Sequence, residues 1–225
     1  MDALLFDFDG VIVHSEPIHM RCLQQVLETV GVKLTDDEYR RHYLGLADRD
    51  ALDRVLARHD RPSEASCLAP LLHAKTTLVQ QCFAEHLPVL PGALELIRGA
   101  SAARVPLAIC SGALRAEILL ALRVLGLTSS FAAIVAAEDV THAKPRPEPY
   151  EKGLGLLAEA VGHPLSAQRS IALEDSPAGL RAARAAGLRV VAIASSYAPE
   201  ALAEAEKVVA TPAALTLASL EALVR

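Results

Sequence analysis

The sequence predicts an α/β protein in which helices cover a parallel sheet and an all-helical segment is inserted near the start. Short apolar runs alternate with longer segments whose apolar residues have helical spacing, and this alternation is typical of a parallel sheet. Residues 16–86 interrupt the alternation, because they show helix signals and no convincing strand. The runs expected as strands are residues 3–6, 107–110, 134–136, 171–173 and 190–193.

Signals for helix ends agree with this periodicity. Segments 117–125 and 178–186 have helical spacing, and they are followed by Gly126 and Gly187 respectively. Glycine accepts the left-handed backbone conformation that commonly ends a helix. We therefore expect both segments to form helices that cover the sheet.

The helical segment predicts a second domain. Residues Thr35 to Glu38 form a capping box, in which Thr35 accepts a backbone hydrogen bond and Glu38 reaches back, so a helix is expected to begin there. We expect a core domain from residues 1–14 and 88–225 and a helical cap domain from residues 15–87. An open parallel sheet binds ligands at the carboxyl ends of its strands. A cap inserted after the first strand would exclude water there and supply substrate contacts.

Composition excludes several classes of partner. The net charge of −5 comes without a basic stripe, aromatic residues make up 4% of the chain, and tryptophan is absent. We therefore expect no nucleic-acid binding. No run approaches the roughly 20 apolar residues of a membrane helix. The four cysteines have no CxxC spacing and are expected to be reduced. With no signal-peptide pattern, a cytoplasmic location is expected, while the oligomeric state stays open.

Two acids directly follow the first apolar run. Asp7 and Asp9 flank Phe8, and Gly10 allows the chain to turn at once. Two carboxylates near a core cost free energy unless a cation accompanies them. The functional interpretation is that Asp7 attacks phosphorus to form an aspartyl phosphate, while Asp9 acts as general acid and general base. The alternative is a solvated acidic turn.

Two further candidate sites follow later expected strands. Ser111 and Gly112 come after residues 107–110, where a hydroxyl and backbone N–H groups can hold phosphate oxygens. The alternative there is an ordinary turn. Lys144 opens the proline-rich segment 144–150 and would offset negative charge on Asp7 and on a phosphate. The alternative is a solvated lysine.

A third site follows the expected strand 171–173. Glu174 and Asp175 come next, and Ser176-Pro177 then provides a typical helix start. Magnesium prefers hard oxygen ligands and takes only one or two carboxylates from a protein. Asp175 is the leading second ligand, and Glu174 is an alternate or outer one. The alternative is that both acids only stabilise the N-terminus of the next helix.

Taken in order, these motifs resemble those of the haloacid dehalogenase superfamily, in the branch of β-phosphoglucomutase and phosphoglycolate-type phosphatases. The motifs are residues 7–11, Ser111, Lys144, and Glu174 with Asp175. The helical insertion is similar to the cap domain of that family. The resemblance implies a Rossmann-like core, a four-helix cap, and Mg²⁺ held by Asp7, the backbone carbonyl of Asp9, and Asp175.

The resemblance also narrows the function. Dehalogenases of the superfamily lack the second aspartate and need no magnesium, so Asp9 favours phosphoryl transfer. The leading hypothesis is a phosphatase for a small phosphorylated sugar or acid, working through an aspartyl-phosphate intermediate. The alternative is a sugar-phosphate mutase, which would pass the same phosphoryl group to a substrate hydroxyl. A binding protein without turnover is a third possibility.

Cap residues bear on this choice through the same resemblance. Glu16 lies in Ser15-Glu16-Pro17, which begins the cap as in many relatives. His19 matches a histidine that helps hold the acid/base aspartate in the mutase, although it could equally be a structural helix residue. Counting from the cap glycine Gly45, Asp48 stands where the mutase has an arginine for substrate phosphate, and Arg49 comes one place later. Glu16, His19 and Arg49 are therefore the candidate substrate contacts.

Overall fold

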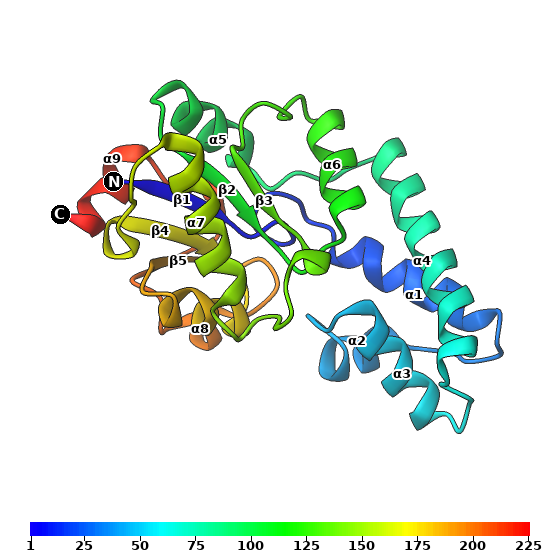
Figure 1. The fold of residues 1–225 in the computed structure, drawn as a ribbon. Coiled ribbons are helices and arrows are strands. Elements are labelled where there is room, and N and C mark those ends of the chain that lie inside the picture. Colours follow the sequence, from blue (N-terminus) through cyan, green and yellow to red (C-terminus); the bar gives the residue numbers. More distant parts are fainter. The chain divides into compact units, whose positions relative to one another are not determined.

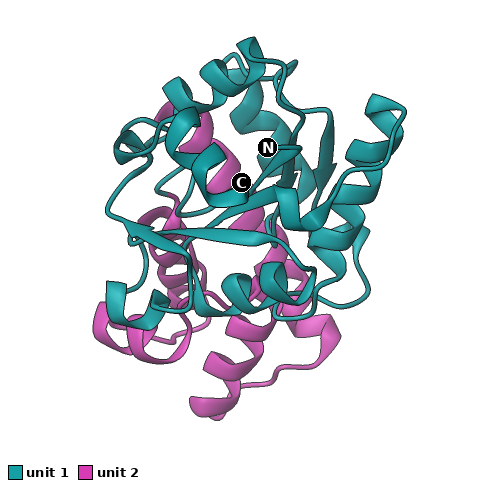
Figure 2. Ribbon diagram, turned by 90° about the vertical axis from the view of Figure 1, so that its left-hand side faces the viewer, with its two compact units in different colours: residues 1–14, 87–225 teal, residues 15–86 magenta.

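The computed structural model describes all 225 residues and divides the chain into two compact units. Unit 1 comprises residues 1–14 and 87–225, and unit 2 comprises residues 15–86 (Figure 2). Each unit has a buried apolar core of its own. None of the helices combines the length and the apolar character that crossing a membrane requires.

Unit 1 is built on a six-stranded sheet with the order β3-β2-β1-β4-β5-β6, in which all neighbouring strands are parallel. The predicted α/β class is therefore confirmed. Every residue of β1, β2 and β4 is buried, which explains why these strands read as continuous apolar runs. The strands are β1 (Ala3–Phe6), β2 (Leu107–Cys110), β3 (Ala133–Val135), β4 (Ser170–Glu174), β5 (Arg189–Ile193) and β6 (Lys207–Val209).

The edge strand β6 has no counterpart among the strands expected from the sequence. It is only 3 residues long, too short to show a period of its own. It is held by pairing with β5, where Val191 is opposite Lys207 and Ile193 is opposite Val209. Tertiary pairing, rather than local pattern, therefore determines this strand.

Helices of unit 1 pack on the sheet, and α7 and α8 contribute to one buried cluster with β1, β2, β4 and β5 (Figure 1). The helices are α5 (Ala93–Ala102), α6 (Arg115–Val124), α7 (Glu148–Val161), α8 (Pro177–Ala185) and α9 (Leu217–Glu221). Short 3₁₀ helices are η1 (Ala137–Asp139), η2 (Ala167–Arg169), η3 (Pro199–Leu202), η4 (Pro212–Ala214) and η5 (Ala222–Val224).

Unit 2 contains four helices and no strand. The Thr35 hydroxyl accepts a hydrogen bond from the Glu38 backbone N–H at 3.2 Å, and α2 begins directly after Thr35. Apolar side chains from all four helices form one core, with Leu23, Leu52 and Leu68 almost fully buried. The helices are α1 (Glu16–Glu28), α2 (Asp36–His42), α3 (Asp48–Arg58) and α4 (Ala65–Glu85).

The chain leaves and re-enters unit 1 through two paired segments, residues 12–14 and 88–90, which we call the stem. Val13 and Val89 form an antiparallel bridge. The His14 N–H donates to the Pro88 carbonyl at 2.8 Å, and the Leu90 N–H donates to the Ile12 carbonyl at 3.0 Å. Backbone hydrogen bonds therefore hold together the two ends between which unit 2 is inserted.

Candidate functional site

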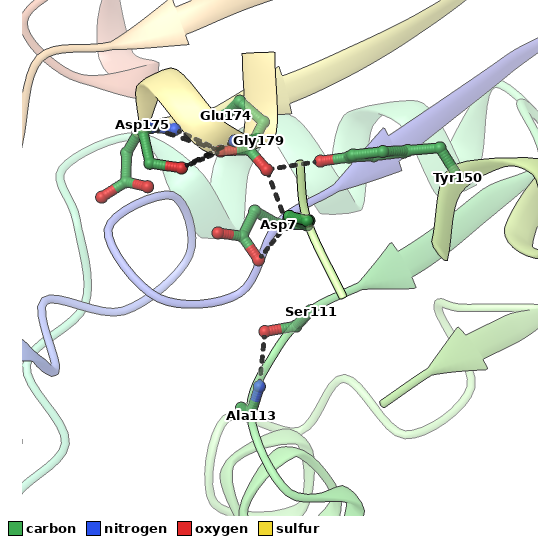
Figure 3. Close-up of polar contacts among 9 residues, drawn as sticks. Asp7, Ser111, Ala113, Tyr150, Glu174, Asp175 and Gly179 are labelled. Atoms are coloured by element: carbon green, nitrogen blue, oxygen red, sulfur yellow. Dashed lines mark hydrogen bonds and ion pairs between the residues drawn. The ribbon is translucent and has the colours of Figure 1, made fainter. Parts of the chain in front are cut away.

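The candidate site lies at the carboxyl ends of the three central strands. Asp7 follows β1, Ser111 follows β2, and Glu174 ends β4 with Asp175 directly after it. Because β1 pairs with β2 on one side and β4 on the other, these residues reach the same edge of the sheet. Figure 3 shows the three acids grouped together, with Ser111 at the end of the neighbouring strand.

Three buried carboxylates crowd this edge. Asp7, Glu174 and Asp175 are 8%, 0% and 6% exposed, and each offers an oxygen within 4.8 Å of the others. Burial raises the pKa of Asp7 to about 7, opposed by Lys144 and reinforced by Glu174 and Asp9. Burial, Asp7 and Glu174 raise the pKa of Asp175 well above its usual range. With all three carboxylates ionised, the cluster would therefore carry more negative charge than the surrounding groups stabilise.

Lys144 is the cation that the structure places within this cluster. Its ammonium lies 3.0 Å from Asp7 Oδ1 and 2.6 Å from Glu174 Oε1. Burial alone would lower the pKa of Lys144, but Asp7 and Glu174 together raise it above its ordinary value, so the side chain stays charged. The single charge of Lys144 does not balance three carboxylates, so a further cation would be stabilised here. Carboxylate oxygens are hard ligands of the kind that Mg²⁺ prefers. The donor set therefore fits a magnesium ion.

Glu174 is already engaged through both carboxylate oxygens. Oε1 accepts from Lys144 at 2.6 Å and from the Tyr150 hydroxyl at 2.7 Å. Oε2 accepts from the Asp175 N–H, the Ser176 N–H and the Ser176 hydroxyl at 3.0, 3.3 and 3.1 Å. A Cβ on Gly179 would lie 1.9 Å from this carboxylate. The Glu174 carboxylate is thus held by hydrogen bonds on both oxygens, and through the Asp175 and Ser176 N–H groups it orients the turn that carries Asp175.

The turn after β1 brings Asp9 to the same edge. Gly10 has a φ of +72°, and a Cβ there would lie 1.9 Å from Asp175 Oδ2, so only glycine fits without rearrangement. The Ser195 hydroxyl donates to the Gly10 carbonyl at 2.5 Å. Asp9 is only half-buried, and its charge contributes to the raised pKa of Asp7. The acid predicted for proton transfer therefore lies close to the predicted nucleophile.

Ser111 and Gly112 form the turn after β2. The Ser111 hydroxyl is buried and accepts a hydrogen bond from the Ala113 N–H at 3.1 Å (Figure 3). Because the oxygen accepts, its proton can be donated to a ligand oxygen. Gly112 is exposed, and a Cβ there would meet nothing within 4 Å. This turn can therefore donate hydrogen bonds to an anion at the strand ends.

Three hydroxyl residues at this site were not among the sequence candidates. Tyr150 contacts Glu174, Ser195 contacts Gly10, and a hydrogen bond from Ser196 opposes the rise in the pKa of Asp175. Both serines come just after the expected strand 190–193, separated from it by Ala194, so they too lie near the carboxyl end of a strand. That position was a usable signal, whereas Tyr150 offers no comparable one.

The candidate residues of unit 2 divide into a cluster and an exposed side chain. The His19 Nδ1 lies 3.0 Å from the Lys75 ammonium, which also donates to Asp48 Oδ1 at 2.5 Å. Glu16 accepts a hydrogen bond from the Tyr39 hydroxyl at 2.6 Å. Burial and Lys75 lower the pKa of His19 to about 3, so its imidazole is neutral. These contacts lie within unit 2.

Arg49 lies apart from those contacts. Its side chain is exposed, whereas its neighbour Asp48 pairs with the buried Lys75. Lys75 is only 1% exposed. At the start of α3 it is therefore Asp48, and not Arg49, that forms the ion pair with a buried side chain.

The crowded carboxylates predict a pH-dependent stability in the absence of metal. An acid whose pKa is raised on folding stabilises the fold fully below its ordinary pKa, and that contribution is lost as the pH rises through the folded value. For Asp7 the window runs from 3.8 to about 7. In EDTA, differential scanning calorimetry should show Tm falling by at least about 4 °C between about pH 5 and about pH 7.

Excess Mg²⁺ should remove most of this fall, and Asp7→Asn should flatten the profile in EDTA. A wild-type Tm that stays constant across this window in EDTA would contradict the carboxylate crowding.

Comparisons with known proteins agree with this geometry. Residues 4–193 match the family model described as haloacid dehalogenase-like hydrolase. A protein of Thermotoga maritima named phosphorylated carbohydrates phosphatase is 29% identical over 188 residues, 84% of this chain and 82% of that protein. Protein CbbY of Rhodobacter capsulatus is 33% identical over 88% of this chain and 87% of that protein. The crystal structure of CbbY from Rhodobacter sphaeroides in complex with phosphate matches with a TM-score of 0.86 and 29% identity, covering 98% of this chain and 99% of that one.

Proposed function

The chain belongs to the haloacid dehalogenase-like hydrolase family, and on that premise we propose that it is a magnesium-dependent phosphatase acting on a small phosphorylated metabolite. The observation that carries the proposal is the pairing of the Asp7 carboxylate with the Lys144 ammonium at 3.0 Å, at the carboxyl end of the central strand. A carboxylate so placed can act as a nucleophile toward phosphorus. The names of relatives favour a sugar phosphate or a small acid such as phosphoglycolate.

In the proposed reaction Asp7 attacks phosphorus, and the bond from phosphorus to the leaving oxygen breaks as the aspartyl phosphate forms. Asp9 gives its proton to the leaving oxygen and then takes a proton from water. The resulting hydroxide attacks phosphorus, which releases phosphate and restores Asp7. The Ser111 hydroxyl, the Gly112 N–H and the Lys144 ammonium hold the phosphate oxygens as charge develops.

A magnesium ion would be held by Asp7, the backbone carbonyl of Asp9, and Asp175, with Glu174 in an outer position. When bound, Mg²⁺ supplies positive charge that offsets the carboxylates and the phosphate. The raised pKa of Asp7 supports this assignment, because a protonated Asp7 is a poor nucleophile. Because Lys144 alone leaves this pKa raised, a second cation beside Asp7 would lower it and keep the carboxylate ionised.

We also propose that unit 2 acts as a cap domain, with Glu16, His19 and Arg49 as candidate contacts to the substrate. The neutral imidazole of His19 supports a hydrogen-bonding role rather than an ionic one. We expect the partner to be a small phosphorylated molecule, with neither nucleic acid nor membrane involved. A cytoplasmic location agrees with such a substrate.

Phosphate release from a panel of sugar phosphates, phosphoglycolate and bisphosphates tests the proposal, with Mg²⁺ and with EDTA. Release that requires Mg²⁺ is expected, and its rates would rank the substrates. If no substrate releases phosphate in Mg²⁺, the phosphatase assignment fails. The third hypothesis, a binding protein without turnover, would then be favoured.

The alternative of a sugar-phosphate mutase rests on His19, which matches a histidine of the mutase and lies in a polar cluster with Lys75. Asp48 argues against the mutase, because it places a carboxylate where the mutase has an arginine. This carboxylate forms an ion pair with Lys75, the one buried lysine of α4. Conversion of β-glucose 1-phosphate to glucose 6-phosphate without phosphate release would favour the mutase.

A further inference from the structure

Tyr150 contacts both Lys144 and Glu174, which form an ion pair at the site. It lies in the first turn of α7 and is 0% exposed. Its hydroxyl donates to Glu174 Oε1 at 2.7 Å, and the Lys144 ammonium lies 5.1 Å from the centre of its ring. A cation at this distance from an aromatic face is attracted to it. Tyr150 thus contacts Glu174 through its hydroxyl and Lys144 through its ring.

The same oxygen of Glu174 also accepts from Lys144, at 2.6 Å. A carboxylate oxygen accepts two hydrogen bonds comfortably, so Tyr150 and Lys144 together satisfy Oε1. Burial, followed by the charges of Glu174 and Asp7, raises the pKa of Tyr150 well above its ordinary value. The hydroxyl therefore stays protonated and remains a donor at neutral pH.

We propose that Tyr150 is a positioning residue: its hydroxyl fixes the Glu174 carboxylate so that Lys144 is held against Asp7. Without that hydrogen bond, Oε1 keeps only Lys144 as its donor. The lysine would then shift toward Glu174 and away from Asp7 Oδ1. The ammonium stabilises the charge that develops on the phosphoryl group in the proposed reaction, so the shift should slow the chemical step more than it weakens substrate binding.

Tyr150→Phe tests this with the smallest change, because it keeps the ring beside Lys144 and removes only the hydroxyl. We expect kcat for the preferred phosphate ester to fall about tenfold, as is common when a supporting hydrogen bond behind a reacting group is lost. KM should stay within about twofold, because the interaction strengthens only in the transition state. Thermal unfolding measured alongside checks that the variant is folded.

A double-mutant cycle with Glu174→Gln tests the route of the effect. If Tyr150 acts through Glu174, the double variant should be no slower than Glu174→Gln alone, since coupled residues give non-additive effects. Tyr43→Phe is a matched control, because it removes a hydroxyl that hydrogen-bonds Glu38 within unit 2. Its kcat should equal that of the wild type. Additive losses in the cycle would overturn the proposal.

A second readout does not require turnover. The kinetic tests depend on the proposed phosphatase function, so a test that is independent of it is needed. The rate at which Lys144 reacts with a water-soluble acetylating ester is such a test, and peptide mass spectrometry measures it. Lys144 should react at least about threefold more slowly in Tyr150→Phe, because Glu174 Oε1, having lost its second donor, binds the ammonium more strongly by about the strength of one ordinary hydrogen bond. The exposed Lys33 serves as internal reference. Unchanged Lys144 reactivity together with unchanged kcat would overturn the proposal. If the wild type hydrolyses no phosphate ester, the phosphatase function fails, and the acetylation result alone decides the role of Tyr150.

Discussion

Asp7→Asn is expected to abolish phosphate release, lowering kcat by at least roughly a thousandfold, because losing a covalent nucleophile removes the whole two-step route. The variant keeps the shape of the side chain and removes one of three crowded carboxylates. Its Tm in EDTA near neutral pH should therefore be higher than that of the wild type, so the lost activity cannot be assigned to unfolding. Continuous phosphate detection and scanning calorimetry measure the two effects.

Asp53→Asn provides the control for Asp7→Asn, since it removes an exposed carboxylate on α3 of unit 2. Neither its kcat nor its Tm should change measurably. A rate for Asp7→Asn within about tenfold of the wild type would exclude Asp7 as the nucleophile, because no neighbouring group could replace it so efficiently.

Asp9→Asn is expected to lower kcat by roughly two to four orders of magnitude, the usual contribution of a general acid and base. Magnesium affinity should change little, because the proposed ligand is the backbone carbonyl of Asp9, which the substitution keeps. Single-turnover kinetics give the rate, and isothermal titration with Mg²⁺ gives the affinity. Full activity would refute the acid/base assignment, and lost magnesium affinity would show that the carboxylate itself is a ligand.

The two variants differ in a way that isolates the intermediate. Asp7→Asn has no group to phosphorylate, so acid-quenched protein should carry no phosphoryl label at any time. Asp9→Asn keeps the nucleophile, so a labelled species should persist if water attack is the slower step. Intact mass spectrometry after quenching distinguishes these outcomes.

Much of the site could be predicted because its residues follow apolar runs. Asp7, Ser111 and Asp175 each stand directly after a strand whose buried residues are recognisable in the sequence. In a parallel sheet such positions meet at one edge. The strand order is not contained in these local patterns, yet it is the placement of β1 between β2 and β4 that brings the three residues together.

Contacts that depend on a single buried partner could not be predicted. Tyr150 reads as one more residue of a proline-rich segment until Glu174 is found 2.7 Å from its hydroxyl. Glu174 itself reads as an alternate metal ligand, whereas five hydrogen bonds engage its carboxylate. A residue's role here follows from which polar atoms surround it after folding, and hydrophobic periodicity carries no information on that.

The stem gives the inserted unit a degree of independence during evolution. Its backbone hydrogen bonds, from His14 to Pro88 and from Leu90 to Ile12, close the ends of the insertion without using any residue of unit 2. The entropy of closing a flexible loop grows only with the logarithm of its length. Insertions of quite different size can therefore be exchanged at this point while the sheet and its carboxylates persist. Selection for a new substrate can therefore change the insertion without changing the residues on which folding of the sheet depends.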